Sequence, residues 1–251
     1  MPKFFIRKQQ IKENEIEILD KDINHIKNVL RKKIDDEIIL CDIDEGIDYM
    51  CRISYISDEK ILCDILEKLD RNVESNINVT ILQGLPKFDK MELVIQKSVE
   101  LGVYEIIPVQ MKRSIVKLEE KDKIKKIQRW QKISEVAAKQ SGRNIVPKIG
   151  QIMNVKDVCN LIKEYDIVLI AYENETKITL KQELEKLKDS IKKEVKIKIA
   201  ILIGPEGGID ESEIELLKQN NAITMTLGKR ILRTETVALN LLSIIMYEFE
   251  N

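Results

Sequence analysis

Two glycine-containing segments hold the residue types best suited to binding a small ligand. Three of the nine glycines fall in Ile203–Gly208 (I-G-P-E-G-G), and Gly228 lies in Leu227–Thr236 (L-G-K-R-I-L-R-T-E-T). Each segment follows a predicted strand and precedes a predicted helix. In an open α/β sheet, ligands bind beyond the carboxyl ends of the strands, where glycine lets backbone groups come close and permits positive φ. Tight turns between strand and helix also use glycine, so either segment alone is weak evidence for a ligand site.

Other common chemistries are disfavoured by the residues present. The chain contains neither the G-x-G-x-x-G pattern of dinucleotide-binding proteins nor the G-x-x-x-x-G-K-[ST] phosphate loop. The only histidine is His25, and the four cysteines form no C-x-x-C pair, so we expect no metal site and no histidine-based catalysis. Their wide spacing favours reduced, buried thiols in a cytoplasmic protein, and these cysteines are Cys41, Cys51, Cys63 and Cys159. No signal peptide and no membrane-spanning run is predicted.

Charge is unevenly distributed along the chain. Residues 85–150 carry 15 basic and 8 acidic side chains, whereas the segments before and after them are acidic. A basic middle region is typical of a phosphate-binding surface, but a solvated lysine-rich helix gives the same charge. By charge alone, both interpretations stay open.

The elements that must position the glycine segments fall into two groups. Residues 1–70 are predicted to be small and mostly β, with isoleucine-rich strands at 36–43, 47–56 and 60–66, and with one helix capped by Asp22. The polar residues 71–78 predict a linker. From residue 79, strands alternate with helices, which predicts a parallel sheet covered by helices on both faces. We expect strands at 79–82, 105–109, 167–171, 197–203 and 222–227, and helices at 90–101, 121–141, 180–191 and 211–219.

The last predicted helix, residues 235–249, is apolar on most sides. A helix that is apolar nearly all round must be buried, either in the core or against another subunit. In a chain of this size, a subunit interface is compatible with the pattern.

Eight segments match one known family in the correct order. They are H-I-K-N-V-L-R (25–31), G-L-P-K-x-D-K-M-E (84–92), Q-K-S-V-E-L-G-V (96–103), I-I-P-V with the following R-S (106–114), K-Q-S-G-R-N (139–144), the pair Tyr172-Glu173, and the two glycine segments. By these motifs the sequence resembles the RsmE family of ribosomal RNA methyltransferases, whose catalytic domain is of the SPOUT class with a deep trefoil knot. Two positions depart from the family pattern. Phe88 stands where glycine is usual, and Val237 stands where alanine is usual.

The resemblance implies a division into a PUA-like β-barrel RNA-binding domain at residues 1–70, a linker at 71–78 and a SPOUT methyltransferase domain at 79–251. It also implies that S-adenosylmethionine, with no metal, is held in the knot mainly by backbone atoms of three loops. The donor-binding residues implied are Leu169, Tyr172, Glu173, Ile203, Gly204, Pro205, Glu206, Gly207, Gly208, Leu227, Gly228, Ile231, Leu232, Thr236 and Ala238.

The activity implied is methylation of N3 of a uridine in 16S ribosomal RNA, within the small subunit, by a cytoplasmic homodimer. The RNA-contact candidates are Arg7, Arg31, Lys87, Arg113 and Arg143. Uracil N3 is a poor nucleophile until it loses its proton, so a cation and a proton acceptor are needed near it.

Arg233 and Glu235 are the candidates for these two roles. For Glu235, stabilisation of the following helix through its dipole is an equally good interpretation. A knotted methyltransferase for another RNA, and a non-catalytic RNA-binding protein of the same fold, remain as alternatives.

Overall fold

The computed structural model describes residues 2–19, 21–190 and 196–250. The chain divides into two compact units. The N-terminal unit contains Met1–Glu74 together with Ala138–Val146, and the C-terminal unit contains Ser75–Ala137 together with Pro147–Asn251. The prediction of two continuous domains separated at 71–78 therefore missed one segment, because the chain returns to the N-terminal unit after leaving it.

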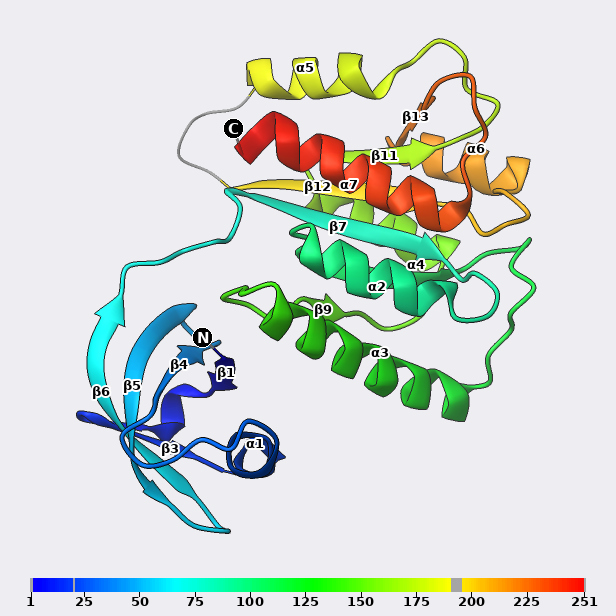
Figure 1. The fold of residues 1–251 in the computed structure, drawn as a ribbon. Helices are drawn as coiled ribbons and strands as arrows, with labels where there is room; N and C mark the ends of the chain where they lie inside the picture. Colours follow the sequence, from blue (N-terminus) through cyan, green and yellow to red (C-terminus); the bar gives the residue numbers. More distant parts are fainter. Residues whose placement is uncertain (1, 20, 191–195, 251) are drawn as a thin grey trace. The chain divides into compact units, whose positions relative to one another are not determined.

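The N-terminal unit is built around a curled, six-stranded sheet (Figure 1). Its strand order is β1-β4-β5-β6-β3-β2, with β1 parallel to β4 and the other neighbours antiparallel. The predicted helix is the short α1 (Lys21–Asn24), continued by a π-helical turn at His25–Val29. Isoleucines from the strands and from this helix form most of the hydrophobic core of the N-terminal unit. The strands are β1 (Lys3–Ile6), β2 (Ile11–Lys12), β3 (Glu15–Ile18), β4 (Glu37–Asp42), β5 (Ile47–Ile56) and β6 (Ile61–Leu69).

A buried polar network binds the returning segment within this unit. The Glu74 carboxylate accepts hydrogen bonds from Arg143 Nε at 3.2 Å and from the backbone N–H of Asn144 at 2.8 Å. The Asn144 side chain donates to Asp48 at 3.1 Å, and Asp48 forms an ion pair with Lys3 at 2.8 Å. Buried charges are tolerated when they are paired and hydrogen-bonded in this way, so the network fixes residues 138–146 to the sheet.

The C-terminal unit contains a parallel sheet with the order β10-β8-β7-β12-β11-β13, and β9 pairs with β8. Every pairing in it is parallel, as predicted. The strand after the linker begins at Ile77, two residues before its predicted start. The strands are β7 (Ile77–Gly84), β8 (Glu105–Gln110), β9 (Lys148–Ile149), β10 (Met153–Asn154), β11 (Ile167–Ala171), β12 (Ile197–Ile203) and β13 (Ile223–Met225).

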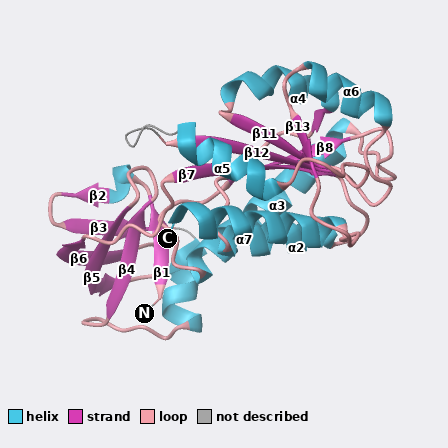
Figure 2. Cartoon of the chain, turned by 90° about the horizontal axis from the view of Figure 1, so that it is seen from above, coloured by secondary structure: helices cyan, strands magenta, loops and turns pink. Residues whose placement is uncertain are grey.

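Helices cover both faces of this sheet (Figure 2), which confirms the predicted architecture. On one face, α4 and α6 pack on Val109, Ile170 and Leu202. On the other face, α7 contacts β7, β12 and α2. The helices are α2 (Lys90–Glu100), α3 (Glu120–Gln140), α4 (Val155–Leu161), α5 (Leu180–Ser190), α6 (Glu211–Gln219) and α7 (Thr234–Glu250), of which α4 was not predicted.

The last helix, α7, is buried on one side only. Six apolar side chains between Val237 and Met246 are buried in the unit. On the opposite side, Ile244 and Tyr247 are exposed and line a shallow groove with Leu239. The predicted need for burial is thus met by the core on one side, while a partly apolar surface remains on the other.

Three further expectations concern membrane-spanning helices, metal ligands and the cysteines. No helix in the described part of the chain combines the length and the apolar character needed to cross a membrane. Among the described residues, no group of three His, Cys, Asp or Glu side chains is arranged to hold a metal ion. All four cysteines are buried free thiols, and burial raises the pKa of both Cys51 and Cys63 to about 12, so neither supplies a thiolate nucleophile.

Candidate functional site

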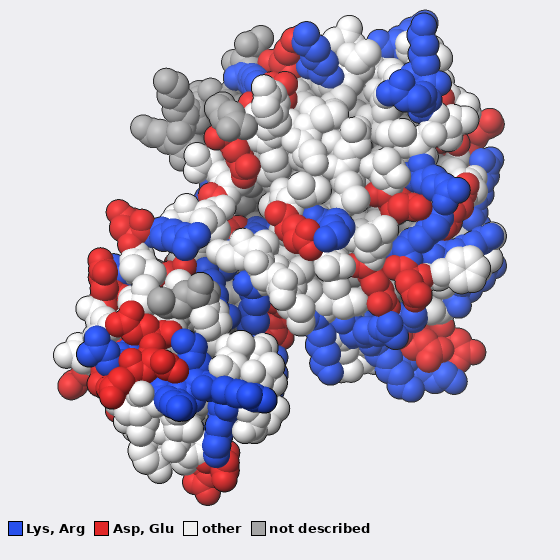
Figure 3. Space-filling model, in the orientation of Figure 1, with Lys and Arg blue, Asp and Glu red and all other residues white. Residues whose placement is uncertain are grey.

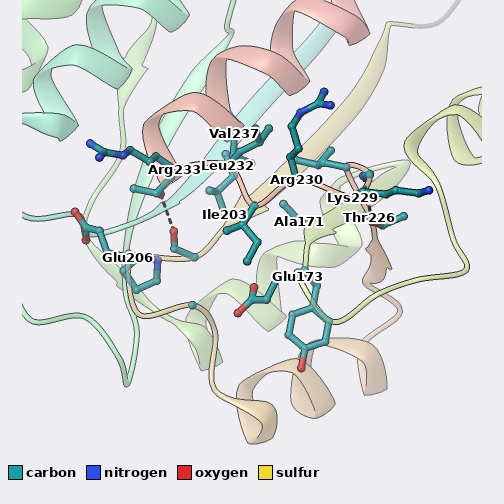
Figure 4. A pocket seen from close by; sticks show the side chains of 18 of the residues that line it. Ala171, Glu173, Ile203, Glu206, Thr226, Lys229, Arg230, Leu232, Arg233 and Val237 are labelled. Atoms are coloured by element: carbon teal, nitrogen blue, oxygen red, sulfur yellow. Dashed lines mark hydrogen bonds between the residues drawn. The ribbon is translucent and has the colours of Figure 1, made fainter.

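A cavity of about 460 Å³ lies at the carboxyl ends of β11, β12 and β13 (Figure 4). The order β12-β11-β13 places these three strand ends side by side. The loops that follow them therefore meet at one edge of the sheet, where ligands of parallel α/β proteins bind. The volume of the cavity is within the range of small-molecule sites, about 300–1,000 Å³. The two glycine segments of the sequence form two of these three loops.

Glycine is required at the cavity for two separate reasons. A Cβ on Gly204 would lie 2.8 Å from Cγ1 of Ile209, which leaves no room for a side chain. Gly208 has a φ of +71°, and a Cβ there would lie 2.5 Å from Oε1 of Glu173. Gly228 also has a positive φ, of +99°. Backbone atoms consequently form much of the cavity wall.

A hydroxyl group joins the loop after β12 to the start of α7. Thr234 Oγ1 donates to the carbonyl of Gly204 at 2.7 Å, and Gln83 Nε2 donates to the same hydroxyl at 2.8 Å. Gln83 and Thr234 are both buried. The last residues of β7, the β12 loop and the first turn of α7 are therefore held together at the cavity.

Glu175 holds in place the loop that follows β11, the third loop at the cavity. Its Oε1 accepts hydrogen bonds from the backbone N–H groups of Thr176, Lys177 and Ile178, and its Oε2 accepts one from Thr224 Oγ1 at 2.8 Å. These bonds, led by that from Lys177, lower the pKa of Glu175 from its usual 4.5 to about 2. A carboxylate thus connects the loop after β11 to β13.

Lys90 connects the two glycine-containing segments at the cavity wall. Its ammonium group lies 2.9 Å from the carboxylate of Glu206 and 3.4 Å from that of Glu235. Hydrogen bonding to Glu206 raises the pKa of Lys90. Partial burial opposes ionisation of Glu206, yet hydrogen bonds from Lys90 and from the backbone hold its pKa below the usual value. Lys90 and Glu206 therefore both stay charged at neutral pH.

Charged groups without an ion-pair partner in the described part of the chain also line the cavity. They are the carboxylate of Glu173 and the cations of Lys229, Arg230 and Arg233. In Figure 4, Glu173 points toward the centre of the group, and the guanidinium groups of Arg230 and Arg233 extend outward. The cavity thus offers one free carboxylate inside and a positively charged margin.

The structure brings most of the predicted donor-binding residues together. Eleven of them line the cavity, together with Arg233: Tyr172, Glu173, Ile203, Gly204, Pro205, Glu206, Gly208, Leu227, Gly228, Ile231 and Leu232. Leu169 and Ala238 are fully buried in β11 and α7, and Gly207 and Thr236 lie outside the lining. Glu235 is not part of the lining either, because its carboxylate is turned toward Lys90.

Seven lining residues were not among those assigned individually from the sequence, although three of them, Ala171, Lys229 and Arg230, lie within the expected donor loops. Lys90 belongs to the matched segment 84–92, so its motif was the available signal. The other six are neighbours in the sequence of predicted positions. That they line the same cavity follows only from the arrangement of the strand ends, and these residues are Ala171, Thr226, Lys229, Arg230, Thr234 and Val237.

The five RNA-contact candidates lie in different environments. Arg143 is 5% exposed and is paired with Glu74 in the buried network of the N-terminal unit, so the structure corrects its interpretation as an RNA contact. Arg31 is exposed, and Arg7 is exposed but paired with Asp44 at 2.6 Å. In the C-terminal unit, Lys87 is half-buried, and Arg113 is an exposed residue that lies 3.7 Å from Asp210.

Comparison with known proteins agrees with this arrangement. Residues 73–246 match the family described as RNA methyltransferase domain, and residues 18–66 match the RNA methyltransferase PUA domain. The ribosomal RNA small subunit methyltransferase E of Bacillus subtilis (strain 168) is 39% identical, covering 100% of this chain and 98% of its own. That of Mesomycoplasma hyopneumoniae (strain 232) is 35% identical, covering 97% and 98%. The crystal structure of the Neisseria gonorrhoeae enzyme of the same name, bound to S-adenosyl methionine, has a TM-score of 0.83 and 30% identity, covering 98% and 97%.

A parallel α/β sheet with a glycine-lined cavity at its carboxyl edge, joined to a PUA domain, defines an RNA methyltransferase of the SPOUT class. Within that class, the chain belongs to the ribosomal RNA small subunit methyltransferase E (RsmE) family.

Proposed function

We propose that this protein transfers a methyl group from S-adenosylmethionine to N3 of a uridine in 16S ribosomal RNA. The observation that carries the proposal is the glycine-lined cavity formed by the three loops after β11, β12 and β13. The relatives named for small-subunit ribosomal RNA methylation support the RNA substrate, and the family resemblance supports the uridine N3 position.

The residues of the cavity are suited to this donor. The missing Cβ atoms at Gly204 and Gly208 leave room for Ile209 and Glu173, and both glycines line the cavity with backbone atoms alone, against which an adenosine group is proposed to lie. The unpaired Glu173 carboxylate complements the positive charge of a sulfonium and an amino group. When bound, S-adenosylmethionine supplies a methyl group on a positively charged sulfur, and sulfur departs as a neutral thioether.

The protein's own groups must prepare the acceptor. Uracil N3 attacks a methyl carbon only after its proton has passed to a carboxylate or to water, and the resulting negative charge spreads over O2 and O4. Arg233, a cation on the cavity wall with no ion-pair partner among the described residues, is the proposed stabiliser of that charge. Glu235 is proposed to position Lys90, since the two groups lie 3.4 Å apart. In-line alignment of acceptor and donor accounts for much of the remaining rate.

Assembly and location form part of the same proposal. The exposed side of α7, with Ile244 and Tyr247, is the proposed surface for a second copy in a homodimer. The substrate is proposed to be 16S RNA within the small ribosomal subunit, which places the protein in the cytoplasm. The trefoil knot remains an expectation from the resemblance, with the three donor loops as its proposed location.

The decisive experiment uses small ribosomal subunits from cells that lack this protein. These are incubated with purified protein and methyl-labelled S-adenosylmethionine, and the RNA is digested to nucleosides. We expect the label in 3-methyluridine. Label in another nucleoside would reject the N3 position, and donor binding without transfer would favour a different RNA. Absence of both would favour a non-catalytic RNA-binding protein.

A further inference from the structure

The loop between β7 and α2 carries an aromatic side chain that is not packed against the rest of the C-terminal unit. Phe88 is 86% exposed, so its ring contributes almost nothing to the core. Its φ is +55°, in the left-handed region that bulky residues rarely adopt. A conformation of this kind is strained, and such strain is concentrated at functional sites. The fold alone therefore gives no reason for phenylalanine here.

Hydrogen bonds hold this loop at the rim of the donor cavity. The Glu206 carboxylate accepts from the backbone N–H of Lys87 at 3.1 Å and pairs with Lys90 at 2.9 Å. Phe88 lies between these two contacts in the sequence, and Glu206 and Lys90 both line the cavity. The chain on both sides of Phe88 is thus bound to Glu206, a residue of the cavity wall.

The surroundings of the ring favour a polyanionic partner. Within the described residues, the ammonium group of Lys87 has no ion-pair partner. The first turn of α2 is joined to α3 by an ion pair of 2.8 Å between Glu92 and Arg129. Lys and Arg side chains gather along α3, at the lower edge of the C-terminal unit in Figure 3. They are Lys121, Lys123, Lys125, Lys126, Arg129 and Lys132. Three of these are paired with acidic side chains, and Lys125, Lys126 and Lys132 have no ion-pair partner among the described residues. Cations of this kind bind an RNA backbone, while base faces are recognised by aromatic rings.

The acceptor atom sets a further requirement, which rests on the proposed function. N3 lies on the edge that uridine uses for base pairing, so the target base must be unpaired and withdrawn from its neighbours before it is methylated. An unpaired base loses stacking, and an exposed aromatic ring can replace it. We propose that Phe88 is a stacking platform that receives an unpaired base of the substrate RNA at the mouth of the donor cavity.

Three substitutions test this role. Phe88→Gly removes the ring and relieves the strained φ, Phe88→Leu keeps an apolar group without an aromatic face, and Phe88→Tyr keeps the face. The measurements are the Kd for small ribosomal subunits in the presence of S-adenosylhomocysteine, and the Kd for S-adenosylmethionine alone. We expect Phe88→Gly and Phe88→Leu to weaken subunit binding about 5- to 150-fold, the range for one stacked base. Phe88→Tyr should stay within about twofold, and donor binding should not change in any variant.

Each other outcome has a definite meaning. Equal subunit affinity for all four proteins would overturn the stacking role, whether or not methylation occurs. Full affinity in Phe88→Leu would replace stacking with a simple apolar contact, and a shift of Phe88→Gly from dimer to monomer would assign the ring to a second copy instead. The expected affinities without label in 3-methyluridine would leave the stacking role standing and reject the N3 assignment.

Discussion

At the scale of single residues, Gly208 combines a positive φ with a crowded position. A side chain there would lie against the Glu173 carboxylate and enter the cavity. We expect Gly208→Val to weaken S-adenosylmethionine binding at least about 100-fold, since overpacking and displaced contacts together cost about 3 kcal/mol or more. Isothermal titration calorimetry measures this directly.

A matched control separates crowding from backbone strain. Gly46 has nearly the same φ, +69°, and the nearest atom to its Cβ position is 3.9 Å away. Gly46→Val should lower the unfolding temperature but leave donor affinity unchanged, because it carries the strain without the contact. Unchanged donor affinity in a folded Gly208→Val protein would contradict the assignment of the cavity.

Arg233 is the residue on which the proposed chemistry depends most. Arg233→Gln should reduce kcat about 100- to 1,000-fold, the loss typical of removing one donor to a developing negative charge. The Kd for S-adenosylmethionine should remain within about twofold, because the proposed contact is with the acceptor base. Single-turnover methylation of subunits gives the rate. Arg230→Gln, the same change on the same wall, is the comparison, and an equal loss in both variants would indicate a general effect of charge.

At the scale of elements, the donor loops owe their geometry to strand order and to a few side-chain hydrogen bonds. Glu175 is the clearest case, because its carboxylate satisfies three backbone N–H groups and the Thr224 hydroxyl. Its folded-state pKa of about 2 lies below the usual 4.5. The charged carboxylate therefore stabilises the fold above pH 4.5, and this contribution disappears as the pH falls toward 2.

The lowered pKa of Glu175 predicts how the stability of the protein depends on pH. We expect Glu175→Gln to reduce the free energy of unfolding at pH 7, and the difference from the original protein to shrink between pH 4.5 and pH 2. Urea titrations across this range measure it. Thr224→Val, which removes only one of the four hydrogen bonds, should show a smaller effect with little pH dependence. A difference that stays constant down to pH 2 would show that the charge is not responsible.

The elements themselves were largely predictable from the sequence. The strands at 167–171 and 197–203 are runs of apolar residues bounded by polar ones, and both have the predicted bounds. By contrast, α4 is a single short helix of seven residues, and β1 and β3 have four residues each, too short for a periodic pattern. The glycine segments identified the cavity, whereas the partnership of Lys90 with Glu206 and Glu235 depends on three segments that are distant in the sequence.

At the scale of the whole molecule, chain connectivity decides which residues are structural. Arg143 matched a family motif and carries a charge, so it was predicted to contact RNA. The structure instead places it in the N-terminal unit as the buried partner of Glu74, with 6% of its side chain exposed. No local pattern distinguishes these roles, because the partner is 69 residues away.

Breaking this pair should destabilise the protein more than any surface change. We expect Glu74→Gln to cost about 1–3 kcal/mol of unfolding free energy, because it removes the charged acceptor of hydrogen bonds from the buried Arg143 side chain and from the Asn144 N–H. Chemical denaturation measures the loss. Glu67→Gln, an isosteric change at an exposed position of β6, should cost less than about 0.5 kcal/mol. Equal effects in the two variants would show that the network contributes little.

The return of residues 138–146 to the N-terminal unit also affects how the protein is made. On the ribosome, the first 74 residues emerge early, but the partners of Glu74 and Asp48 at Arg143 and Asn144 are synthesised about 70 to 100 residues later. Until more than half of the chain has been translated, Glu74 lacks the partners Arg143 and Asn144, and Asp48 is paired with Lys3 alone. A fragment ending at residue 74 would lack residues 138–146, which belong to the same compact unit, so this unit is complete only after most of the second unit's first half has been synthesised.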